Sequence, residues 1–112
     1  MIAVVFEVTP ADGRRTDYLA MAAALRSDLE GMPGFVSVER FESLTNPGKL
    51  LSLSFWQDEE ALRNWRCHGK HRDAQHAGRN GIFAHYRLRV AGVLRDYEIA
   101  ARRDQAPPDA PF

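Results

Sequence analysis

The segment FVSVERFESLTNPGKLLSLSFW, from Phe35 to Trp56, decides the fold of this chain of 112 residues. Residues 35–44 and residues 50–56 each alternate between two kinds of side chain, which is typical of a β-strand whose two faces differ. Between them, Pro47 fixes its own φ and Gly48 can adopt a positive φ, so TNPGK predicts a turn. Two strands joined by a short turn form an antiparallel hairpin.

The residues before this hairpin predict a strand and then a helix. The sequence IAVVFEV, residues 2–8, is rich in β-branched and aromatic residues and stops before Pro10, as a buried strand does. Over residues 14–30 the apolar side chains recur at steps of three and four, which predicts an amphipathic helix. The sequence GMPG, residues 31–34, ends that helix.

The residues after the hairpin predict a second helical region and a last strand. Asp58 is the expected N-cap, and Gly69 divides the region into two pieces, the second of which runs to Ala77. A long strand is predicted over residues 85–99, with a bulge or bend at Gly92. Residues 100–112 contain three prolines and no periodic apolar face, so they are predicted to be a disordered tail.

The predicted order is therefore β-α-β-β-α-β within one α+β domain, residues 1–99. This is the split-βαβ, ferredoxin-like plan, in which an antiparallel sheet carries its helices on one face. The other face must line a cavity or be covered by a partner. Because small domains often cover such a face by pairing, we expect a homodimer.

Composition excludes several classes of function. The chain has 15 basic and 15 acidic residues, so its net charge gives no reason to expect nucleic acid or an anionic membrane as partner. Its one cysteine, Cys67, cannot form an internal disulfide. No signal peptide and no apolar run of roughly 20 residues is evident. We expect a soluble, cytoplasmic protein.

The segment NWRCHGKHRDAQHAGR, from Asn64 to Arg79, holds most of the residues that could perform chemistry. It contains three of the four histidines and the cysteine. His68, His71 and His76 are separated by steps of three and five, so one helical face cannot gather all three, and we do not predict a metal site.

A different set in this segment does share a helical face, namely His71, Gln75 and Arg79. Such a polar stripe suits the rim of a pocket, where His71 could accept a proton and Arg79 could hold an oxyanion. The other interpretation is a hydrogen-bonded pair at a dimer seam. For His68 and His85 we expect solvent exposure.

Two further residues are candidates for the pocket. Trp65 could provide a flat wall against which a planar substrate stacks. Glu7 lies on the predicted first strand, where a carboxylate is costly unless paired. It either pairs with Arg40, Arg87 or Arg89, or it is a base with a raised pKa.

Four segments carry a resemblance to a known family: PGFVSVERFES, LLSLSFWQDEEALRNW, HRDAQHAGR and YRLRVAGVLRDY. They resemble the antibiotic biosynthesis monooxygenase (ABM) domain over residues 2–97. The resemblance implies a dimeric α/β barrel. It also implies one of several activities, since that family contains cofactor-independent oxygenases of polyketide quinols, haem-degrading oxygenases and quinol oxygenases.

In the haem-degrading members, a first-strand Asn, a Trp and a His ten residues after that Trp surround the haem. Trp65 matches, but the Asn position falls at about Glu7 and the His position at Gln75. His76 stands one residue later and would point about 100° away on a helix. Haem bound through His76 or His71 is therefore kept as an alternative.

In the cofactor-independent members, an Asn, a Trp, an Arg and a Tyr hold an aromatic quinol. Residues of these types here are Asn64, Trp65, Arg79 and Tyr86. From the resemblance we predict a homodimeric monooxygenase that oxidises an aromatic or quinol-like molecule with O2, without metal or flavin. A dimer that binds a small ligand without catalysis is the remaining alternative.

The roles predicted for this activity rest on a base, an anion holder and a dry apolar cavity. His71 or Glu7 would be the base, and Arg79 with Asn64 would hold the developing anion. Trp65 with Phe6 or Phe83 would form the walls. Gln75 and Tyr86 would complete the substrate site.

Overall fold

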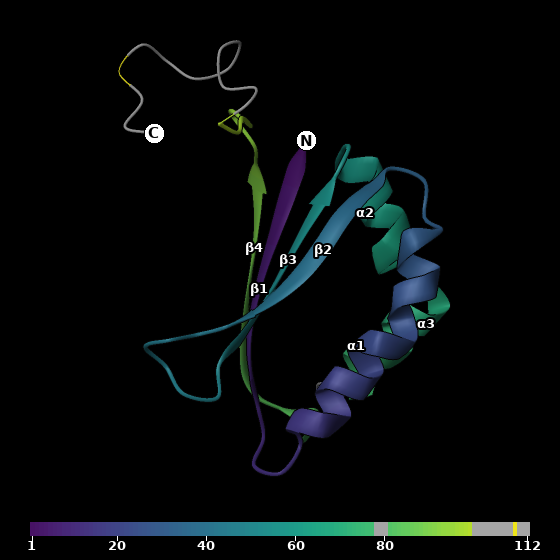
Figure 1. Ribbon diagram of the computed structural model, residues 1–112. Coiled ribbons are helices and arrows are strands. Elements are labelled where there is room, and N and C mark those ends of the chain that lie inside the picture. Colours follow the sequence, from purple (N-terminus) through teal and green to yellow (C-terminus); the bar gives the residue numbers. More distant parts are fainter. Residues whose placement is uncertain (78–80, 100–108, 110–112) are drawn as a thin grey trace.

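The computed structural model describes residues 1–77, 81–99 and 109. Its elements are, in order, β1 (Ile2–Pro10), α1 (Arg15–Glu30), β2 (Phe35–Glu42), β3 (Leu50–Trp56), α2 (Glu59–Arg66), α3 (Gly69–Ala77) and β4 (Phe83–Gly92) (Figure 1). This order confirms the predicted β-α-β-β-α-β plan, including the division of the second helical region at Gly69.

The four strands form one sheet in the order β2-β3-β1-β4, and every neighbouring pair is antiparallel. Figure 1 shows all three helices on the same side of this sheet. The predicted ferredoxin-like fold is thus confirmed within a single chain, and the sheet is open rather than closed into a barrel. None of the helices in the described part of the chain is long and apolar enough to cross a membrane.

The hairpin from Phe35 to Trp56 contains an irregularity that the alternation did not indicate. Phe35 pairs with Trp56 and Ser37 pairs with Phe55, so one extra residue stands in β2 at this point. Such a bulge changes the face to which the following residues point. As a result Phe35 and Val38 both pack against the core, and the Phe35 ring meets Trp56 edge-on at 5.4 Å.

The start of β2 lies directly against α2. Gly34 adopts a φ of +81°, and a Cβ placed on it would lie 2.5 Å from the Cβ of Ala61. A side chain here would meet both backbone strain and a clash. The predicted N-cap of α2 is confirmed, since the backbone N–H of Ala61 donates to Asp58 Oδ1 at 2.9 Å.

The last strand differs from its prediction. It begins at Phe83 and ends at Gly92, so Gly92 terminates the strand instead of bending it. Along its partner β1, the register shifts between Thr9 and Pro10. The predicted tail, residues 100–112, lies outside the described residues except for Asp109.

The core has two centres between sheet and helices. One is built around Trp56, Trp65 and Leu62, and the other around Val8, Tyr18 and Ile82. Trp56 and Val8 are 1% exposed. Between these two centres the packing leaves a cavity.

Candidate functional site

The cavity has a volume of about 280 Å³ and is lined by residues of all four strands and all three helices. Its floor is the helix-facing side of the sheet, and its roof is the inner side of α1, α2 and α3. This volume is close to the lower end of the range for small-molecule pockets in proteins. The cavity could therefore hold a compact molecule of two or three fused rings.

Two rows of side chains cross the floor from β2 to β4. Following the strand register, one row is Arg40, Ser52, Phe6 and Leu88, and the next is Val38, Ser54, Val4 and Val90. All eight residues line the cavity. The first row changes from polar on β2 and β3 to apolar on β1 and β4, whereas Ser54 is the one polar member of the second row.

The apolar end of the floor is aromatic. The rings of Phe6, Phe83 and Tyr86 form a triangle with centroid distances of 5.7, 6.0 and 6.0 Å. Tyr18 from α1 meets Phe83 edge-on at 5.7 Å. Phe6, Phe83 and Tyr86 were all predicted as substrate-contacting residues, and the structure brings them together at the cavity.

The helical wall of the cavity combines Trp65 and His71. Trp65 is 7% exposed, and its indole lies 6.4 Å from that of Trp56 with ring planes at 30°. The imidazole of His71 lies 4.9 Å from the Trp65 ring on the cavity side. The predicted aromatic wall and the predicted base are thus in contact.

Burial lowers the pKa of His71 below its ordinary value of 6.5. A hydrogen bond with the backbone of Arg66 acts in the opposite direction, and the nearby imidazole of His68 lowers the pKa further. At neutral pH the ring is therefore uncharged, and a neutral imidazole has one nitrogen free to accept a proton. Nδ1 of His71 is buried and has no hydrogen-bond partner in the described part of the chain.

The helical face predicted to carry His71, Gln75 and Arg79 is confirmed for its first two members. His71 and Gln75 both line the cavity, together with Ala74. Arg79, the predicted anion holder, lies outside the described residues.

Two other predicted residues do not reach the cavity. Asn64 is exposed on α2 and is not among the lining residues, because the inner face of α2 is occupied by Leu62, Trp65 and Arg66. His76, one of the two histidines of the haem alternative, is exposed and also absent from the lining. As expected from its helical position, it points to a different side from His71.

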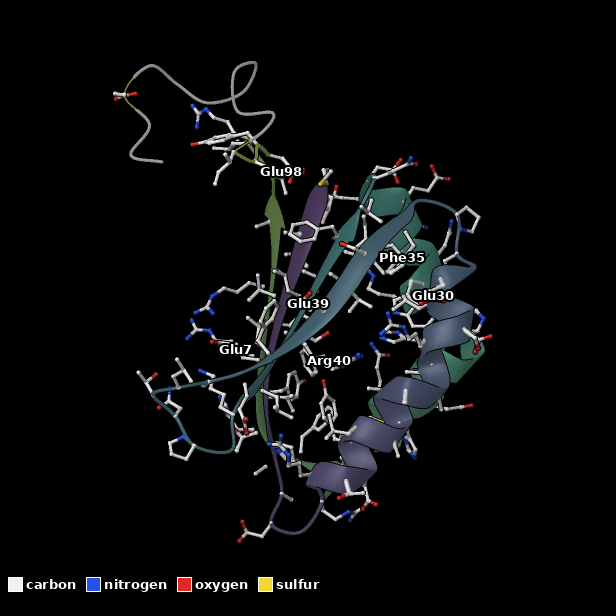
Figure 2. All side chains as sticks on the ribbon, in the orientation of Figure 1. Glu7, Glu30, Phe35, Glu39, Arg40 and Glu98 are labelled. Carbon is white, nitrogen blue, oxygen red and sulfur yellow. The ribbon has the colours of Figure 1, made fainter. Side chains whose placement is uncertain are left out.

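The prediction of a raised pKa for Glu7 is wrong. Its neighbours Phe6 and Val8 face the helices, so Glu7 points to the opposite face of the sheet, as Figure 2 also shows. Its carboxylate pairs with Lys49 Nζ at 3.0 Å and Arg89 Nη1 at 3.1 Å. The hydrogen bond from Lys49 and the charges of both partners lower the pKa of Glu7, although partial burial acts against them. The alternative of pairing with Arg89 is confirmed.

The expectation of solvent exposure is wrong for His68 and confirmed for His85. His68 stacks behind Trp65 at 5.4 Å, with its Nδ1 buried, because the short link between α2 and α3 folds it back onto the indole. His85 is exposed on β4. Among the residues described, no group of three or more His, Cys, Asp and Glu side chains could hold a metal ion.

Arg40, like Arg66 of α2, lines the cavity although it was not predicted to do so. It was considered only as a partner for Glu7, whereas the structure places it on the helix side of the sheet (Figure 2). Its Nε is buried and has no hydrogen-bond partner among the described residues. The available signal was its spacing from Val38, which puts the two residues on one face of the strand.

The fold and the cavity together define a small α+β domain with a largely apolar cavity between its sheet and its helices. Residues 1–77 match the family described as antibiotic biosynthesis monooxygenase. The chain is 44% identical over 93 residues to the jasmonate monooxygenase ABM of Pyricularia oryzae and 31% identical over 93 residues to the uncharacterised protein YqjZ of Bacillus subtilis. The chain therefore belongs to the antibiotic biosynthesis monooxygenase family.

The extent of these similarities differs between the relatives. Both alignments cover 83% of this chain, but they cover 43% of the fungal protein and 79% of the bacterial one. This chain thus corresponds to less than half of the jasmonate monooxygenase. The solved structure of Rv0793 from Mycobacterium tuberculosis has the same fold, with a TM-score of 0.78 at 18% identity over 87% of this chain and 98% of that chain.

Proposed function

We propose that this protein is a monooxygenase that oxidises a small aromatic, quinol-like molecule with O2 and without metal or flavin. The observation that carries the proposal is the contact of a neutral His71 with the Trp65 ring in the wall of an apolar cavity. Family membership supports a monooxygenase, and the cavity supports an organic substrate.

The proposed reaction begins with His71 as a general base. Its neutral imidazole removes the proton from the hydroxyl of an electron-rich phenol, and the resulting anion donates electrons directly to O2. One oxygen atom is bonded to a ring carbon, which loses its hydrogen, and the other oxygen atom leaves as water. The phenol becomes a quinone and supplies all four electrons that O2 accepts, so no separate reductant is needed.

The remaining cavity residues hold the substrate for this step. Trp65 on one side, and Phe6 with Phe83 on the other, form flat walls for an aromatic ring. Tyr86 extends the aromatic floor, and Gln75 lies beside His71 on α3. Because these walls are apolar, they exclude water from the anion and strengthen its interactions with polar groups.

A haem-dependent activity is not proposed. The haem alternative offered two histidines. His76 is exposed and lies outside the cavity lining, and His71 lines the cavity but stands six residues after Trp65 instead of ten. The first-strand position that carries Asn in haem-degrading members is Glu7, which faces the other side of the sheet and is already paired. The described residues therefore do not fit a haem site of that kind.

We also propose that the protein is a homodimer. All three helices lie on one side of the sheet (Figure 1), and the other side carries Val5, Leu51, Leu53, Phe55 and the 43% exposed Phe41. An uncovered apolar sheet face favours association, because burying it removes hydrocarbon from water. Two such sheets packed face to face would give the dimeric α/β barrel.

Light scattering tests the dimer directly. Leu53 pairs with Val5 in the middle of this face, so Leu53→Glu should convert the dimer to a monomer. Leu19→Glu is the matched control, since Leu19 is a 38% exposed residue of α1, and this variant should remain a dimer. A wild-type protein that is monomeric at high concentration would contradict the proposal.

Oxygen uptake tests the activity. Anthrone and a naphthalenediol would be supplied to the wild-type protein and to His71→Ala in an oxygen-electrode cell. We expect uptake and formation of the quinone with the wild type, and only the background autoxidation rate with His71→Ala. Jasmonate, which the name of the fungal relative suggests, belongs in the same panel with and without a reductant. Binding of these compounds without any oxygen uptake would favour the non-catalytic ligand-binding dimer.

A further inference from the structure

We propose that Arg40, together with Ser52, forms a subsite for an anionic oxygen group, so that the preferred ligand of the cavity is a ring system that carries a carboxylate. This inference rests on the proposed function, because it assumes that the cavity is the substrate site. It adds the chemical class of the substrate and the direction in which the substrate lies.

The first argument is the state of the Arg40 side chain. A guanidinium is always charged and offers five N–H donors. Arg40 points into a largely apolar cavity, and its buried Nε donates to no acceptor among the described residues. Burying such a donor without a partner is costly, which a ligand that supplies the acceptor would offset.

The second argument is that the nearby carboxylates are unavailable. Glu39 follows the strand alternation onto the opposite face of the sheet, and Glu42 pairs with Arg15 of α1 at 3.0 Å. In the described part of the chain no carboxylate forms an ion pair with Arg40. The charge of Arg40 is therefore directed at the cavity.

The third argument is the arrangement of the floor. Ser52 lies opposite Arg40 in the strand register and offers a second polar group on the same part of the cavity floor. Ser54 lies one row away, opposite Val38, and its hydroxyl oxygen accepts a hydrogen bond from Trp56 Nε1 at 3.1 Å. From Arg40, the row continues through Phe6 to Leu88, three strand spacings or about 14 Å away.

This polarity orients a ligand. An anionic group over β2 and β3 leaves the ring system over the aromatic triangle of Phe6, Phe83 and Tyr86. Arginine suits the polar end because its planar fork can donate two parallel hydrogen bonds to a carboxylate. Trp65 and His71 then lie on the roof above the ligand instead of at its charged end.

Isothermal titration calorimetry with a matched pair of ligands tests the subsite. Naphthaleneacetate and its uncharged methyl ester differ in charge but hardly in shape. We expect the wild type to bind the carboxylate roughly ten- to a hundred-fold more tightly than the ester, the effect of one charge-assisted interaction. Arg40→Met should bind the two equally, and Arg40→Lys should keep part of the preference.

Arg26→Met is the control. Arg26 is an exposed residue of α1 that pairs with Glu30 at 2.9 Å, and its removal should leave the preference unchanged. A preference that is absent in the wild type, or that persists in Arg40→Met, overturns the subsite. In that case oxygen uptake with neutral phenols can still support the proposed function. If neither compound binds at millimolar concentration, the subsite is also overturned, and the proposed function then depends on the oxygen-uptake test alone.

Discussion

The imidazole of His71 lies against the indole of Trp65, with ring centroids 4.9 Å apart and ring planes at 35°. Trp65 is held from behind by Trp56, which is almost fully buried. The contact therefore fixes the plane of the imidazole and removes water from one of its faces. The loss of water favours the neutral ring, which is the form that can act as a base.

The pH dependence of the reaction should report this neutral ring. Oxygen uptake should fall as pH drops through the lowered pKa of His71, so the acid limb of the rate profile should lie below 6.5. His71→Gln should lower kcat roughly a hundred- to ten-thousand-fold, the usual contribution of a general base. His85→Gln is the matched control, since His85 is exposed, and it should keep the wild-type profile.

Stability should depend on pH through the same residue. Because burial lowers the pKa of His71 in the folded state, the unfolded chain binds a proton at a higher pH than the folded chain does. The free energy of unfolding should therefore decrease as pH falls from the unfolded pKa towards the folded one. Thermal unfolding at about pH 7.5 and about pH 5.5 should show a larger loss for the wild type than for His71→Gln. Equal losses would show that His71 titrates normally.

Glu7 should be dispensable for the reaction. It lies on the opposite face of the sheet, and its pairing with Lys49 and Arg89 lowers its pKa, which makes the carboxylate a poor base. Glu7→Gln should leave kcat within about twofold of the wild type, far from the effect of losing a general base. A loss comparable to that of His71→Gln, in a protein of unchanged assembly, would assign the base to Glu7 instead.

Gly34 should tolerate no side chain. Its positive φ costs an ordinary residue about 1–3 kcal/mol, and its Cβ would clash with Ala61, which adds about 1–3 kcal/mol. Gly48 has a similar φ of +84° but nothing within 4 Å of a Cβ, so Gly48→Ala should incur the strain alone. The urea concentration at the unfolding midpoint should therefore be lower for Gly34→Ala than for Gly48→Ala. Equal midpoints would mean that α2 moves away from residue 34 without an energetic cost.

The fold could be predicted because its signals are local. Each signal extends over a few residues: the alternation in β3, the turn at Pro47 and Gly48, and the N-cap at Asp58. Once the order of the strands and helices is known, few topologies remain possible. The end of β4 was missed because Gly92 is compatible with either a bulge or a strand end. Only pairing with β1, which starts at Ile2 opposite Gly92, decides between them.

The site could be predicted only in part. His71 and Gln75 were found because helical spacing places them on one face. Arg40 was missed because β2 contains a bulge after Phe35. In a regular strand Phe35 and Val38, three residues apart, would point to opposite faces, but here both pack against the core. That irregularity hides which set of β2 residues faces inward. Asn64 was misplaced because its residue type, rather than its position on α2, suggested a role.

Trp56 and Trp65 are the two tryptophans of the chain, and both line the cavity. The tryptophan fluorescence of the protein therefore originates entirely from the wall of its candidate site, and no label is required to observe it. A protonated imidazole quenches the emission of an adjacent indole much more than a neutral one does, so the emission of Trp65 should dim as His71 gains its proton. His68 also stacks on Trp65, and comparison with His71→Gln separates the effect of His71 from that of His68. The protein thus carries its own optical indicator of the charge on the residue proposed to start the reaction.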